Sequence, residues 1–143
     1  IFMDYRRFGN TIMARFDKGE EITEELKKVC TKEKITLAHV SAIGAIDDFT
    51  AGVFFVQEKE YHTNHFTGYF EITSLTGTIT TQNGEYYSHL HISAADEEGK
   101  VFGGHLNRAV ISATCEVVIQ VIDGCVERES NKDVGLNVFK FLS

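Results

Sequence analysis

Three histidines near the middle of the chain have the residue type and the spacing of metal ligands. His89 and His91 lie two residues apart in a run of alternating residues, so they share one face of a predicted strand. His105 follows in a second alternating run. Neutral imidazole is a common ligand of Zn²⁺, with its nitrogen about 2.0–2.1 Å from the ion. The three residues therefore predict a metal site, provided that the two runs pair in the correct register.

The turn between the two runs determines that register. Residues 96–100 are polar, and Gly99 suits the left-handed third position of a three-residue hairpin loop. Pairing back from this loop places His91 opposite His105, with His89 two residues along on the same face. Directly opposed side chains have their Cβ atoms about 4.5–5.5 Å apart, which is close enough for imidazoles to share one ion.

The other face of this hairpin tests the register, because a slip by one residue would exchange the two faces. Its side chains are all apolar, as expected for a core face: Leu90, Ile92, Ala94, Phe102 and Leu106. Packing therefore explains this face and leaves the histidine face unexplained. Gly103 and Gly104 precede His105, and glycine inside a strand often marks a bulge or a close backbone approach. The pairing at His105 depends on these two residues.

A second predicted hairpin adds hydroxyl groups to the histidine face. Asn-Gly at 83–84 is a strong signal for a two-residue turn. Pairing back from this turn places Thr78 beside His89 and Thr76 beside His91. We therefore expect hydroxyls to line the histidine face.

Two other residues are weaker candidates. Glu71 lies upstream of the threonines, and it is the acidic residue that a catalytic metal site would use as a base. His39 lies in the apolar run 35–46, and a lone histidine in such a strand is more often a hydrogen-bonded core residue than a ligand. The sequence assigns a role to neither residue.

The elements that must position these side chains are mostly strands. Alternating or β-branched apolar runs predict about seven strands, mainly in 1–16, 35–46, 49–57, 69–81, 85–95, 110–122 and 136–141. One amphipathic helix is predicted over 20–32, with an apolar stripe at Ile22, Leu26, Val29 and Cys30. Residues 58–67 are predicted to be a polar connection or a short hairpin, and residues 127–133 a charged loop. The fold class is therefore α+β, a single domain over residues 1–143 with one main helix and a mostly antiparallel or mixed sheet.

Composition places limits on function. Hydrophobic residues make up 43% of the 143 residues, enough for the core of one domain. The net charge of −7 argues against a broad surface for a phosphate backbone, which requires clustered Lys and Arg. Three cysteines at unrelated spacings do not suggest a disulfide framework, and Cys30 and Cys115 are predicted to be buried thiols. Without a signal peptide or a long apolar segment, we expect a cytoplasmic protein with no membrane partner.

Five short motifs follow one another along the chain: KGEE at 18–21, SAIGA at 41–45, FEITSLTG at 70–77, HLHIS at 89–93 and GGHL at 103–106. In this order they resemble the PPC domain, named for its presence in plants and prokaryotes, and the resemblance covers nearly the whole chain. It implies a PPC-like fold and a homotrimer, as in the free-standing prokaryotic members. It also implies metal at the histidines that correspond to His89, His91 and His105.

The resemblance bears on DNA as well. In plants the same domain follows AT-hook peptides that bind the DNA minor groove, and the family is often labelled DNA-binding. This sequence contains no Arg-Gly-Arg core and no basic arm. DNA is therefore a partner by family label, while the residues predict weak direct affinity.

The residues leave three interpretations open. The one we favour is a regulatory or interaction module, labelled putative DNA-binding in the family, that forms a homotrimer and holds one divalent transition metal, expected to be zinc. The alternative is a small zinc-dependent enzyme, because three His ligands with an open fourth position are the pattern of catalytic zinc. The third is a metal-free domain with a polar sheet face. The sequence indicates no catalytic residue, substrate or organic cofactor, and it leaves a small-molecule ligand open.

Overall fold

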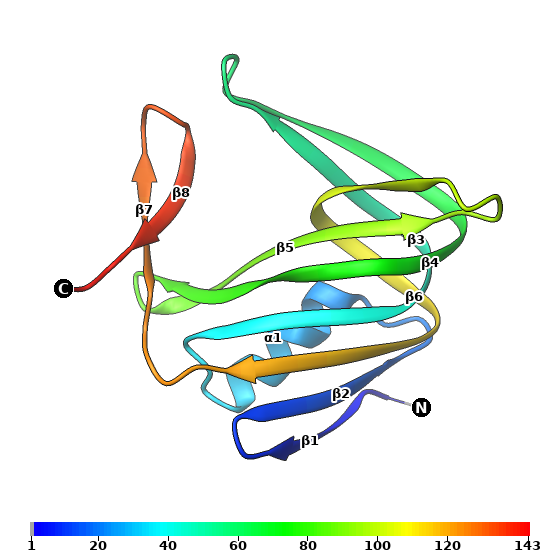
Figure 1. Ribbon diagram of the computed structural model, residues 1–143, viewed down its shortest axis with the longest axis horizontal. Helices are drawn as coiled ribbons and strands as arrows, with labels where there is room; N and C mark the ends of the chain where they lie inside the picture. The colour runs from blue at the N-terminus through cyan, green and yellow to red at the C-terminus, as the bar shows by residue number, and fades with distance from the viewer. Residues whose placement is uncertain (1) are drawn as a thin grey trace.

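The computed structural model describes residues 2–143. In this part of the chain it contains eight strands and one helix: β1 (Asp4–Phe8), β2 (Thr11–Asp17), α1 (Ile22–Lys32), β3 (Ala38–Phe55), β4 (Glu60–Gln82), β5 (Glu85–Ala95), β6 (Val101–Val121), β7 (Glu127–Asn131) and β8 (Leu136–Lys140). The α+β class with one helix is therefore confirmed, and the strands number eight rather than about seven. Figure 1 shows how β3, β4 and β6 run far along the molecule.

Six strands form one antiparallel sheet in the order β1-β2-β6-β3-β4-β5. Strand β6 is central: it pairs with β2 on one side and with β3 on the other, as its apolar residues on both faces predict. The first part of β6 also pairs with β5. Strands β3, β4, β5 and β6 therefore form a closed ring of paired strands at one end of the sheet. Strands β7 and β8 form a separate hairpin that stands beside the main sheet in Figure 1.

Helix α1 lies behind the sheet in Figure 1 and packs against β6 and β5. Its buried residues include the predicted stripe: Ile22, Leu26, Val29 and Cys30. The Glu21 carboxylate caps the helix by accepting hydrogen bonds from the backbone N–H groups of Thr23 and Glu24. It also accepts a 2.8 Å bond from the backbone N–H of Ala109, so the cap ties the helix to β6. No helix within residues 2–143 is long and apolar enough to cross a membrane.

Several predicted strand boundaries were wrong. The single strand predicted over 1–16 is a hairpin of β1 and β2, because Gly9, with φ of +62°, makes a tight turn between them. The strands predicted over 35–46 and 49–57 form one strand, β3, because β-bulges bend the chain there without ending its pairing.

The two predicted polar segments are also mainly strand. Residues 60–67 belong to β4 and continue the arm that β3 and β4 form together. Residues 127–131 form β7. Residues 60–67 look polar because nearly all of their side chains are exposed. Residues 127–131 are all charged or polar, including the buried Arg128, so neither sequence carries the apolar alternation of a strand with one buried face.

The core lies on one face of the sheet and leaves the histidine face open. The Phe49 side chain is fully buried, and its ring centroid lies 4.8 Å from that of Phe66 and 5.1 Å from that of Phe70. Four of the predicted core residues of the histidine hairpin are buried: Leu90, Ile92, Ala94 and Leu106. The prediction for Phe102 was wrong, because this side chain is 37% exposed and covers Phe66 from the edge of the core.

Candidate metal centre

The three histidines come together on the open face of the sheet. The β5–β6 pairing places His91 directly opposite His105. The β4–β5 pairing places Thr78 opposite His89 and Thr76 opposite His91. The predicted register of both hairpins is therefore confirmed, and the two hydroxyl-bearing residues lie beside the imidazoles.

The three imidazole rings are close enough to share one ion. Their ring centroids are 5.0 Å apart for His89–His91, 5.2 Å for His89–His105 and 5.9 Å for His91–His105. One ring nitrogen from each residue lies within 4.8 Å of the other two. In a tetrahedral zinc site, with Zn–N about 2.0–2.1 Å, neighbouring ligand nitrogens are about 3.4 Å apart. Side-chain rotations that bring the nitrogens together by about 1 Å would complete such a site, so these residues fit the metal.

A cavity of about 540 Å³ opens beside the three rings. The arm of β3 and β4, strands β5 and β6, and the hairpin strand β8 all contribute to its walls. Apart from the histidines, the lining residues are apolar, aromatic or neutral: Gly52, Val53, Phe54, Tyr61, Tyr87, Gly104, Leu136 and Asn137. Within residues 2–143 no acidic side chain lines the cavity, although the chain as a whole carries a net charge of −7.

The surroundings keep two of the imidazoles neutral. Burial lowers the pKa of His89 below its usual 6.5, and the neighbouring His105, His91 and Arg128 lower it further. Burial also lowers the pKa of His105, with a smaller contribution from His91. Metal ligation requires an unprotonated nitrogen, so both side chains are available to a metal at neutral pH.

A glycine beside His105 allows the backbones of β6 and β3 to approach closely in the wall of the cavity. Gly104 has φ of +148°, and a Cβ atom at this position would lie 2.5 Å from the carbonyl oxygen of Gly52 in β3. Only glycine permits this approach of the β6 and β3 backbones. The β5–β6 pairing continues through Gly103 and Gly104 without a shift, so His105 lies where the sequence predicts.

Neither of the two weaker candidates joins the cluster. His39 lies on β3, and its ring nitrogens make hydrogen bonds to Gln120 Oε1 at 3.0 Å and to Thr76 Oγ1 at 3.2 Å. Glu71 pairs with Ala95 in β5, four residues beyond His91, which is roughly 13 Å along a strand. Glu71 therefore does not line the cavity, and it is not placed to act as a base there.

Two residues near the site, Tyr61 and Arg128, were not predicted from the sequence. The Tyr61 hydroxyl donates to Asn107 Oδ1 at 2.8 Å and contacts the His105 carbonyl oxygen at 3.2 Å. Its ring meets that of His105 edge-on at 5.7 Å. Arg128 lies on β7, and its guanidinium carbon is 4.7 Å from the ring centroid of Tyr87, which lines the cavity. Tyr61 lies in an exposed polar segment and Arg128 is a buried charge in a second polar segment, so no pattern in the sequence connects them to the histidines.

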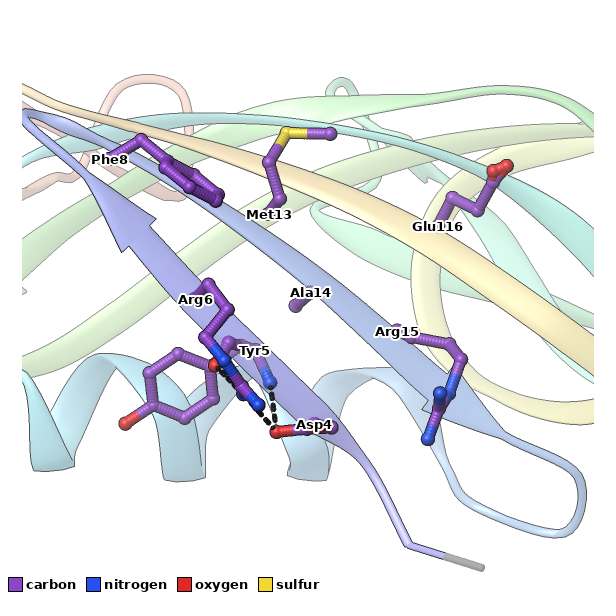
Figure 2. A pocket seen from close by; sticks show the side chains of 8 residues that line it. All are labelled: Asp4, Tyr5, Arg6, Phe8, Met13, Ala14, Arg15 and Glu116. Carbon is purple, nitrogen blue, oxygen red and sulfur yellow. Dashed lines mark hydrogen bonds and ion pairs between the residues drawn. The ribbon is translucent and has the colours of Figure 1, made fainter.

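A second hollow, of about 400 Å³, lies on β1 and β2 and is shown in Figure 2. It is an open surface lined by charged and apolar side chains. Arg6 donates to Asp4 Oδ1 at 2.6 Å, and Arg15 donates to Asp17 Oδ1 at 2.8 Å, so its basic groups already have partners. The hollow brings no group of metal ligands together, and the histidine cavity is the better candidate site.

The fold and the site together define a one-helix antiparallel domain with a three-histidine cavity on its open sheet face. Residues 3–123 match the family described as the Plants and Prokaryotes Conserved (PCC) domain, also written PPC. The chain belongs to this family. The match ends before β7, so the hairpin that adds Leu136 and Asn137 to the cavity lies outside the matched region.

Three solved structures are similar over almost the whole chain. A protein from Bacteroides thetaiotaomicron, described as a putative DNA-binding protein, is 30% identical, with a TM-score of 0.95 and coverage of 99% of each chain. A PPC protein from Pyrococcus horikoshii is 31% identical, with a TM-score of 0.84 and coverage of 99% of this chain and 96% of that one. A metal-containing protein from Archaeoglobus fulgidus is 26% identical, with a TM-score of 0.86 and coverage of 99% of each chain. No match was found among curated protein sequences.

Proposed function

We propose that this protein is a regulatory or interaction module whose three-histidine centre, formed by His89, His91 and His105, binds one zinc ion. The observation that carries the proposal is the approach of three ring nitrogens within 4.8 Å at the edge of a cavity. A tetrahedral ion held by these three histidines at the edge of the cavity would keep a fourth position for a ligand from that cavity. The similar structure from A. fulgidus, described as a metal-containing protein, supports the same proposal.

Metal analysis of the purified protein tests this function. We expect one zinc per chain after dialysis against zinc and removal of excess metal. The His91→Ala variant should lose the zinc while its hairpin survives, because the apolar residues on the other face of β5 stay buried. His62→Ala is the matched control, since His62 lies on the exposed arm of β4 outside the cavity. Equal zinc in wild type and His91→Ala would contradict the proposal.

We further propose that the module is a homotrimer. Large apolar side chains remain exposed on a single chain, including Met13, Ile43, Val53, Phe55 and Tyr69. An exposed apolar surface of this kind is typical of an interface between subunits. The aromatic residues Phe54, Tyr86 and Tyr87 contribute less to this exposed surface, because they are already half-buried within the chain.

DNA binding is the second candidate function, because similar structures from B. thetaiotaomicron and Ralstonia eutropha are described as putative DNA-binding proteins. The surface argues for weak direct affinity. Many of its basic residues pair with carboxylates: Arg6, Arg7, Arg15, Lys28, Lys100 and Arg108. With these pairs and a net charge of −7, the protein has no excess of positive charge to release counterions from DNA. A shift assay with AT-rich duplex at 150 mM salt tests this, and submicromolar binding there would make DNA the primary partner.

The enzyme alternative is favoured by the cavity itself, which leaves room for a small molecule beside an open metal position. A bound zinc would supply a water of lowered pKa. An enzyme would also need a general base, and no carboxylate within residues 2–143 lines the cavity to act as one. For this reason we place the binding module first.

A further inference from the structure

Arg128 on β7 carries a positive charge in a buried position. Its side chain is only 7% exposed, and no carboxylate within residues 2–143 forms an ion pair with it. Burial lowers its pKa, yet an arginine remains charged at neutral pH. Buried charges in proteins are normally paired, because the desolvation cost is otherwise uncompensated. A buried guanidinium without a counterion therefore requires an explanation.

The partners of Arg128 are neutral and leave its outer nitrogens weakly held. Nε donates to Thr80 Oγ1 at 3.0 Å, whereas the two terminal nitrogens reach the Asn137 carbonyl oxygen at 3.3 Å and Thr78 Oγ1 at 3.4 Å. A bond from guanidinium to carboxylate is usually about 2.7–2.9 Å long. The guanidinium has five N–H groups, and these three hydrogen bonds use one on each nitrogen. The second N–H of each terminal nitrogen therefore has no partner within residues 2–143.

Arg128 does not itself line the histidine cavity but lies directly behind its β8 end. Tyr87 and Asn137, which contact the guanidinium, both line the cavity. Thr78, the third contact, lies directly opposite His89. The rings of Tyr87 and Phe139 lie 4.7 and 4.6 Å from the guanidinium carbon, so the charge is held in place against aromatic surface.

We propose that the three-histidine site takes a small organic carboxylate, with its charged end at the open metal position on the Tyr87 and Asn137 side of the cavity, behind which Arg128 lies. The inference rests on the proposed zinc centre: three neutral imidazoles leave the charge of a divalent ion uncompensated, and Arg128 adds a second uncompensated charge behind the wall of the same cavity. No acidic residue lines the cavity to balance either charge. The rest of the ligand lies against the apolar part of the wall, formed by Val53, Phe54 and Leu136.

Calorimetry with hexanoate and hexanamide tests the proposal on the zinc-loaded protein. The two probes have the same apolar chain and nearly the same shape, and only hexanoate is charged. We expect wild-type protein to bind hexanoate at least about tenfold more tightly than hexanamide, as for loss of a charge-assisted hydrogen bond. Equal binding of the two probes, or no binding of hexanoate at millimolar concentration, would overturn the proposal. This comparison uses no variant and so does not depend on how a substitution folds.

Variants then assign the selectivity to Arg128. Arg128→Gln should weaken hexanoate binding by at least about tenfold while leaving hexanamide binding within about twofold. Arg6→Gln is the matched control, because it removes the same charge from an exposed arginine on β1 and should leave the affinity within about twofold. Amide hydrogen exchange of residues 127–140 verifies that the β7–β8 hairpin stays docked in Arg128→Gln. A docked hairpin with unchanged hexanoate affinity would overturn the role of Arg128.

Zinc content, measured on every sample, separates this inference from the proposed function. Protein without zinc would refute the metal centre, and the carboxylate proposal with it. Protein with one zinc per chain but without a preference for hexanoate would refute the carboxylate proposal alone.

Discussion

Replacing Gly104 by alanine should destabilise the protein and loosen the histidine site together. Gly104 has φ of +148°, and a methyl group there would lie 2.5 Å from the carbonyl oxygen of Gly52. A side chain held in such a glycine-only conformation costs of order 1–3 kcal/mol. Backbone shifts that relieve the overlap add roughly 1–3 kcal/mol. Gly104→Ala should therefore lower the free energy of unfolding by about 2–6 kcal/mol, a large part of the 5–15 kcal/mol typical of a domain.

Gly99→Ala provides the matched control, because Gly99 also has a positive φ, +81°, but a Cβ there meets nothing within 4 Å. Gly99→Ala should lower the free energy of unfolding by only about 1–2 kcal/mol, the cost of a side chain at a positive φ without any steric overlap. Urea unfolding of both variants at one protein concentration gives the difference, since subunit association makes stability depend on concentration. Zinc affinity should fall about tenfold in Gly104→Ala, because its neighbour His105 is displaced. If Gly104→Ala is as stable as Gly99→Ala and binds zinc as tightly as wild type, β6 does not approach β3 as described.

The environments of the histidines, the thiols and the exposed surface lead to four further predictions. The pKa values of His89 and His105 are lowered, so protons compete with zinc for these two side chains only below pH 6.5. Metal analysis should therefore find zinc occupancy retained at pH 6.5 and lost between about pH 6 and 5. The metal-free protein should also lose stability to urea as pH falls below 6.5, since the unfolded chain takes up protons first. Burial raises the pKa of Cys30 and Cys115 to about 12, so a thiol reagent should react quickly only with the exposed Cys125, and three fast thiols per chain would contradict this. Light scattering should give three times the 16.1 kDa mass of one chain, and a monomer at micromolar concentration would contradict the trimer.

The histidine hairpin could be predicted from the sequence because its determinants are local. The loop glycine at Gly99 fixes the turn, and the period of two along each strand fixes which side chains share a face. Those two rules suffice to bring His91 opposite His105. The threonines beside them follow from the Asn-Gly turn in the same way.

The C-terminal wall of the cavity could not be predicted because its position depends on contacts distant in sequence. The Glu127 carboxylate accepts hydrogen bonds from the backbone N–H groups of Asn83 and Gly84, which docks the hairpin onto the β4–β5 turn. At the other end, a Cβ atom placed on Gly135 would lie 3.1 Å from Phe54 in the β3–β4 arm. These contacts join segments 44 and 81 residues apart, and nothing in residues 127–140 taken alone indicates them.

The most direct test of the zinc centre is X-ray diffraction from crystals of the zinc-loaded protein, collected above and below the zinc absorption edge. We expect one anomalous peak per chain among the rings of His89, His91 and His105, with each ligand nitrogen about 2.0–2.1 Å from the ion. The remaining coordination position should face the cavity. An anomalous map without a peak among these rings, from crystals in which zinc is bound elsewhere or not at all, would contradict the account.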